Sequence, residues 1–157
     1  LAILTLAIAA PIFYFAFQIK AGIADFPYCL KDGSIKELLE NYGDAEKSNY
    51  AIVQKFDMIF PAAYGMFLAA LIYKFWHSSP WRIAAIIPLF ATFFDYIENA
   101  KIAQMTSYSA DLPSELYSQV YFATNAKFVM LGLALAVLII GVILSRSNKA
   151  SKMIGET

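Results

Sequence analysis

The chain has 157 residues, of which 60% are hydrophobic, 16% aromatic and 15% charged, and its formal net charge is zero. A soluble domain is about 45–50% apolar and roughly 25% charged, so this composition indicates a membrane protein. No basic block points to nucleic acid. Cys29 and His77 are the only cysteine and histidine, which excludes an internal disulfide and a cysteine- or histidine-based metal centre. We expect one domain, residues 1–157, with no metal or cofactor.

Four apolar stretches predict membrane spans, at about residues 1–19, 56–76, 81–102 and 120–144. Each approaches the roughly 20 residues that a helix needs to cross the hydrocarbon core. Backbone groups in lipid must be paired within the segment, so these spans are predicted to be helices. The first stretch lacks a small-residue cleavage motif and is interpreted as a span, not as a signal peptide. The predicted fold is all-α, a polytopic membrane protein with a four-transmembrane-helix bundle.

The turn at 77–80 between the second and third spans forces them to be antiparallel. Lys74 and Arg82 flank it, and further basic residues follow the fourth span on the same side. By the positive-inside rule this side is cytoplasmic, which places both termini there. Seven lysines lie toward the other side, but they are spread over longer segments and outnumbered by acids. The short loops favour a bacterial inner membrane.

The outer loop, residues 21–55, carries helix signals of its own. The Ser-x-x-Glu pattern of Ser34 and Glu37 is that of a capping box and predicts a short extramembrane helix at about 35–42. Gly43 suits its end, and Asp44 suits the N-cap of a new helix that begins near residue 45 and leads into the second span. Pro113 similarly suits the start of the helix that contains the fourth span.

Ionisable residues fall at matching ends of the spans, so antiparallel packing would bring them to one depth. Asp95 and Glu98 share a helix face with Asn99, because they are spaced i, i+3 and i+4. Ionisable groups within a span usually mark a ligand, ion or partner site. We expect an aromatic cavity with a carboxylate-rich mouth near the outer leaflet, open toward the outer loop. Its predicted ligand-binding residues are Asp57, Tyr64, Asp95, Glu98, Asn99, Tyr121, Asn125 and Lys127.

The charges in this cluster do not balance. Asp57, Asp95 and Glu98 against Lys127 leave two uncompensated negative charges when all are ionised. Either a carboxyl stays protonated, or a cation or cationic ligand binds, or water enters the cluster. The structural alternative is that these residues only hold helices together, as polar residues in membranes often do. Asp95 lies deepest in its span and is the strongest single candidate for a functional residue.

Two segments, Phe56–Gly65 and Phe94–Asn99, resemble small uncharacterised bacterial membrane proteins with four predicted helices. The architecture is more loosely similar to that of the emopamil-binding, sterol-isomerase-like group. That resemblance implies a site for sterol-like or cationic amphipathic ligands, with acids at Asp57 and Glu98 able to hold a cation or move a proton.

The leading functional hypothesis is a membrane protein that either binds a small amphipathic, lipid-like ligand or serves as an accessory subunit of a membrane complex. Its expected surroundings are membrane lipids and, through the apolar fourth span, a membrane-protein partner. The alternative is a lipid or isoprenoid enzyme in which Glu98 and Asp95 exchange protons as acid and base. A proton or cation pathway is disfavoured, because the inner halves of the spans hold few polar residues.

Overall fold

The structure is a computed structural model that describes residues 2–17, 43–107 and 113–155, and in these ranges every regular element is helical. This confirms the all-α prediction. The elements are α1 (Ala2–Phe17), α3 (Asp44–Asp57), α4 (Phe60–Trp76), the 3₁₀ helix η2 (Pro80–Ile86), α5 (Ile87–Ser107) and α6 (Ser114–Gly155). The extramembrane helix expected at 35–42 lies outside the described residues.

Three helical stretches are long and apolar enough to cross a membrane: Asp44–Trp76, Pro80–Met105 and Ser114–Ser147. They correspond to the second, third and fourth predicted spans. The first predicted span is represented by α1, which is apolar but only 16 residues long in the described range. Three spans are therefore supported by helix length and composition.

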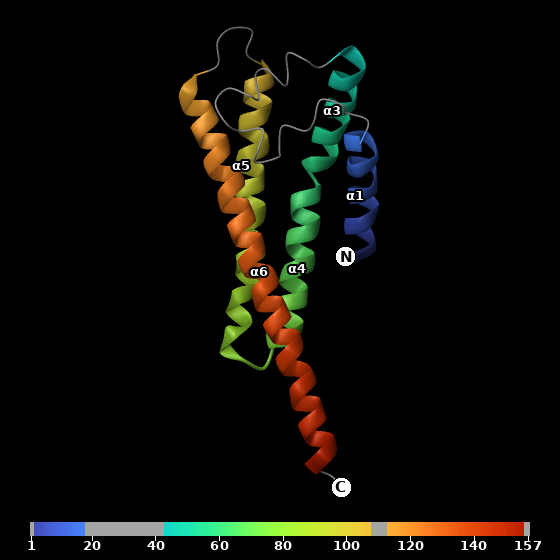
Figure 1. Cartoon of the computed structure of the whole chain (residues 1–157), viewed down its shortest axis with the longest axis vertical. Coiled ribbons are helices and arrows are strands. Elements are labelled where there is room, and N and C mark those ends of the chain that lie inside the picture. Colours follow the sequence, from blue (N-terminus) through green and yellow to red (C-terminus); the bar gives the residue numbers. More distant parts are fainter. Residues whose placement is uncertain (1, 18–42, 108–112, 156–157) are drawn as a thin grey trace.

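The three long stretches form the centre of the molecule (Figure 1). α5 and α6 run antiparallel and pack along much of their length, and α4 packs against both. α1 lies beside α3 and α4, away from α5. Below, the end where α3 and α6 begin is called the α3 end, and the end with the turn at 77–79 is called the turn end. α6 continues past the turn end, beyond the other helices (Figure 1).

The stretch Asp44–Trp76, which contains the second predicted span, is two helices joined end to end. α3 begins at Asp44, one residue earlier than expected, because Gly43 rather than Asp44 occupies the N-cap position. The Gly43 N–H donates to Glu46 Oε2 at 3.0 Å, so the carboxylate of the first turn satisfies the N–H of the N-cap residue. Between α3 and α4 the helix is interrupted at Met58 and Ile59, two residues before Pro61. A proline lacks the N–H that would continue the helical ladder, which accounts for the interruption.

The third span begins as a 3₁₀ helix, which the sequence analysis does not predict. Ser79 caps η2 by accepting a hydrogen bond from the Trp81 N–H through its side chain, at 3.3 Å. Pro80 stands at the first helical position, where a missing N–H costs nothing. Pro88 follows at the second residue of α5, so it cannot donate to Ala84 across the junction. The two prolines thus bound the segment in which the tighter helix forms.

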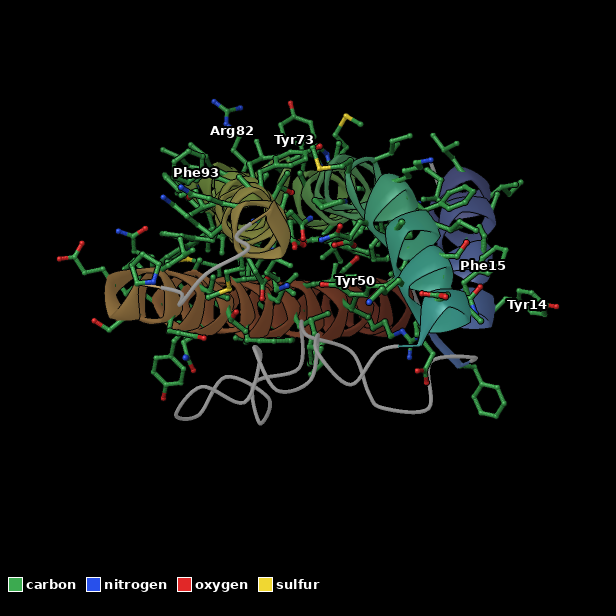
Figure 2. All side chains as sticks on the ribbon, turned by 90° about the horizontal axis from the view of Figure 1, so that it is seen from above. Tyr14, Phe15, Tyr50, Tyr73, Arg82 and Phe93 are labelled. Carbon is green, nitrogen blue, oxygen red and sulfur yellow. The ribbon has the colours of Figure 1, made fainter. Side chains whose placement is uncertain are left out.

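Two apolar clusters stabilise the ends of the bundle. The cluster near the α3 end, here called the cap layer, is contributed by α1, α3, α5 and α6, and its buried members are Ala16, Tyr50, Val53, Ile102, Met105, Leu116 and Val120. The cluster near the turn end, here called the turn layer, consists of Ile72, Ala84 and Ala134, with Trp76 packed against it. In Figure 2, seen from the α3 end, Tyr50 lies between α3 and α6, whereas Tyr73, Arg82 and Phe93 lie at the outer surface.

Trp76 fixes the turn end of α4 to α6. Its indole N–H donates to the Val137 carbonyl at 3.1 Å, and the ring lies where a side chain on Gly141 would be. A Cβ at Gly141 would come within 3.1 Å of Trp76 Cδ1, and closer still to the indole nitrogen. This close approach gives Gly141 a specific role in packing.

We therefore expect Gly141→Ala to displace the Trp76 ring and break its hydrogen bond. In a Trp81→Phe background Trp76 is the sole tryptophan, and its fluorescence should shift to longer wavelength as the indole leaves the helix contact. Gly132→Ala on the same helix is the control, because nothing lies within 4 Å of a Cβ there. An unchanged spectrum for Gly141→Ala would contradict this packing.

Candidate functional site

Polar side chains from α4, α5, α6 and the end of α3 meet between the cap layer and the turn layer. This polar cluster consists of Asp57, Tyr64, Asp95, Glu98, Asn99, Thr124 and Lys127. Asp95, Glu98, Asn99, Thr124 and Lys127 are buried. Burying five polar residues in candidate membrane spans costs desolvation free energy, and this makes the cluster the clearest candidate site.

Lys127 is the centre of the cluster. Its ammonium donates to Asp95 Oδ1 at 3.1 Å and to Glu98 Oε2, so one cation bridges two carboxylates on α5. The Lys127 side chain is 10% exposed, whereas that of Glu98 is fully buried. An ion pair in such surroundings is held by charge-assisted hydrogen bonds that water does not weaken.

The remaining carboxylate oxygens are also engaged. The Tyr64 hydroxyl on α4 donates to Asp95 Oδ2 at 2.7 Å, and the Thr124 hydroxyl on α6 donates to Glu98 Oε1. Thr124 Oγ1 also lies 3.0 Å from the Val120 carbonyl one turn earlier. Each oxygen of Asp95 and Glu98 therefore has a protein donor, and these donors join α4 and α6 to α5.

Asp57 takes part through a different kind of contact. Its backbone carbonyl is the one that residue 61 would pair with in an unbroken helix, and Pro61 has no N–H to donate. Asn99 Nδ2 on α5 donates to this carbonyl instead, at 3.2 Å. Among the described residues Asp57 has no ion-pair partner, and its strongest charged neighbour is Asp95, which has the same sign.

The cluster lies deep in the bundle. Lys127 precedes Val137, the residue that contacts Trp76, by ten positions, or about 15 Å along a helix. Tyr64 precedes Trp76 by twelve positions, or about 18 Å. Asp57 precedes Trp76 by nineteen positions, or about 28 Å, so the cluster extends from the middle of α4 to the end of α3.

Six of the eight predicted ligand residues come together: Asp57, Tyr64, Asp95, Glu98, Asn99 and Lys127. Tyr121 and Asn125 do not join them. Tyr121 is 48% exposed, and the exposed Asn125 side chain donates to the Tyr121 carbonyl of its own helix at 2.7 Å. Thr124 lies in the cluster but outside the predicted ligand set; its spacing of three from Lys127 is the signal that could have identified it.

The cap layer separates the cluster from the α3 end. Val53 lies one helical turn before Asp57, Ile102 lies one turn after Glu98, and Val120 lies one turn before Thr124. These three side chains are almost fully buried. The carboxylates are thus covered by apolar side chains on the side where the sequence analysis expects an open mouth.

The chemistry available to the cluster is that of carboxylates, one ammonium and two hydroxyls. These groups can hold a cation, share protons or fix helices to one another. In the part of the chain that the structure describes, no three His, Cys, Asp or Glu residues are arranged to hold a metal ion.

No family model, curated protein or solved structure matches this chain.

Proposed function

We propose that the chain is an integral membrane protein that binds a small amphipathic molecule with a positively charged group at the polar cluster. The observation that carries this proposal is that one ammonium is shared by two buried carboxylates, while a third carboxyl, that of Asp57, belongs to the same cluster and has no ion-pair partner among the described residues. An uncompensated charge at this depth is costly, and a cationic ligand would offset it. The apolar part of such a ligand suits the surrounding lipid and aromatic side chains.

Asp57 is the residue best placed to receive the charge of the ligand. Asp95 and Glu98 already share Lys127 and have donors on every carboxylate oxygen. The Asp57 carboxylate has no ion-pair partner among the described residues; the Asn99 amide donates to its backbone carbonyl, and the carboxylate lies near a like charge. It is also only partly buried, so a ligand can reach it with less disruption of the fold.

The exposed surface of α6 supports a second candidate, an accessory subunit of a membrane complex. Large apolar residues are exposed on this helix toward the turn end, namely Leu133, Leu135, Ile139, Ile140, Ile143 and Leu144. A partner helix could cover them as well as lipid does. In this case the polar cluster would serve to orient α4, α5 and α6.

Native mass spectrometry of the protein released from mild detergent distinguishes the two. We expect a stoichiometric small cationic molecule on the wild type, and its loss from Asp57→Asn, because the substitution removes the unpaired charge and keeps the shape of the side chain. Glu115→Gln is the matched control, since Glu115 is an exposed carboxylate in the first turn of α6.

Unchanged ligand retention in both Asp57→Asn and Asp95→Asn would refute the binding proposal. A defined protein partner with no small molecule would favour the accessory subunit. A bound lipid that is chemically altered by the wild type, with a bell-shaped pH profile, would favour the acid–base enzyme instead.

A further inference from the structure

The cap layer raises the question of how a molecule would reach the polar cluster. α3 contributes Tyr50 and Val53 to this layer, and both are at most 4% exposed. They pack against residues of α5 and α6 directly beyond the carboxylates. In Figure 2 Tyr50 lies in the space between α3 and α6. α3 is therefore the helix whose displacement would uncover the cluster from the α3 end.

The junction between α3 and α4 has the properties of a hinge. At Met58 and Ile59 the regular helix gives way to a turn, and both side chains are more than half exposed. The Ile59 N–H pairs with the Phe56 carbonyl, three residues back, and the Ala63 N–H reaches the Ile59 carbonyl at 3.3 Å. Pro61 removes one further bond of the ladder. The Met58 N–H still pairs with the Gln54 carbonyl, so the irregular part of the ladder is confined to the few residues between Met58 and Pro61, where a pivot would lie.

The two sides differ in how they are attached to α5. On the α4 side, Thr92 Oγ1 donates to the Pro61 carbonyl at 2.8 Å, and Gly65 lets the helices approach so closely that a Cβ there would overlap Thr92. On the α3 side, Asn99 Nδ2 donates to the Asp57 carbonyl at 3.2 Å. α4 is therefore fixed to α5 by a close helix approach, whereas α3 is held by this hydrogen bond and by the apolar contacts of Tyr50 and Val53 in the cap layer.

We propose that α3 is a hinged cap, which pivots at Met58–Ile59 and is held closed by Asn99. This inference rests on the proposed function, since it describes the route by which the ligand enters. Asn99 donates to the Asp57 carbonyl, so the cap is fastened through the backbone of the same residue whose side chain receives the ligand. Binding of a cation at Asp57 and opening of the cap are thereby coupled.

Distances between spin labels test the hinge without any ligand. In a Cys29→Ser background, one pair of labelled cysteines at Lys47 on α3 and Ser118 on α6 reports the cap. A second pair at Ala100 on α5 and Ser118 is the reference within the α5–α6 unit. All three positions are exposed. We expect two distance populations for the cap pair in lipid nanodiscs and one narrow population for the reference pair.

Two substitutions should move the cap in opposite directions. Asn99→Ala removes one hydrogen bond of the closed form, which should raise the ratio of open to closed molecules by about fivefold. Pro61→Ala restores an N–H for the Asp57 carbonyl, so the cap pair should collapse to one narrow distance. If the cap pair is as narrow as the reference in the wild type and unchanged by Asn99→Ala, the hinge is wrong.

The outcome is separable from that of the ligand experiment. A mobile cap in a protein that retains no small molecule would leave the hinge standing and refute the binding proposal. A rigid cap in a protein that loses its ligand on Asp57→Asn would support the binding proposal and refute the hinge.

Discussion

Lys127→Met lowers the free energy of unfolding by about 3–5 kcal/mol, the range expected when one partner of a buried ion pair is removed. The substitution leaves Asp95 and Glu98 buried side by side without the ammonium that bridges them. Methionine is close to lysine in length and shape, so the loss reports charge rather than volume. Denaturant or thermal unfolding of the purified protein in one detergent provides the measurement.

Two variants make the cause explicit. Lys55→Met is the same substitution on an exposed residue of α3 and should change the unfolding midpoint little. Adding Asp95→Asn and Glu98→Gln to Lys127→Met should recover much of the lost stability, because the two buried carboxylates that Lys127 bridges are then neutral. Equal stability of Lys127→Met and Lys55→Met would show that Lys127 does not neutralise the cluster.

Gly65→Ala is expected to lower the free energy of unfolding by about 1–3 kcal/mol, the usual cost of overpacking a tight contact. The new methyl group would overlap Thr92 Oγ1 and lie 3.3 Å from the Pro88 carbonyl oxygen. Thr92 would have to turn away, and its hydrogen bond to the Pro61 carbonyl would be lost. The fixed contact between α4 and α5 depends on this glycine.

Gly132→Ala is the matched control, and it should raise the free energy of unfolding instead of lowering it. A Cβ at Gly132 meets nothing within 4 Å, and alanine is favoured over glycine in a helix by about 1 kcal/mol. Both variants are compared by the same unfolding measurement as above. A stability for Gly65→Ala equal to or above that of the wild type would contradict the close approach of the two helices.

The sequence predicted the polar cluster well where helical spacing was unambiguous. Asp95, Glu98 and Asn99 share a face at any helix rotation that buries one of them, and the structure buries all three. On α6 the same reasoning failed for Tyr121. The stripe that reaches α5 runs through Leu116, Val120 and Ala123, and Tyr121 is turned away from it by one position, about 100°.

Other features could not be obtained from spacing. Apolar residues are common along every span, so the sequence does not say which of them cover the carboxylates; the cap layer is formed by four helices that only the fold brings together. The hydrogen bond from Asn99 to the Asp57 carbonyl likewise depends on how far α5 is shifted along the stretch formed by α3 and α4. The 3₁₀ start of the third span depends on two prolines whose combined effect single-residue preferences do not predict.

The order of the cluster residues along the chain has a consequence for biogenesis. Asp95 and Glu98 are synthesised before Lys127, so α5 leaves the ribosome with two acids and without the cation that pairs with them in the finished bundle. Each ionised acid raises the cost of transfer from the translocon into lipid. We therefore expect the hairpin of α4 and α5 to be completed only when α6 arrives, and a nascent chain that ends before Lys127 to remain susceptible to quality-control proteolysis.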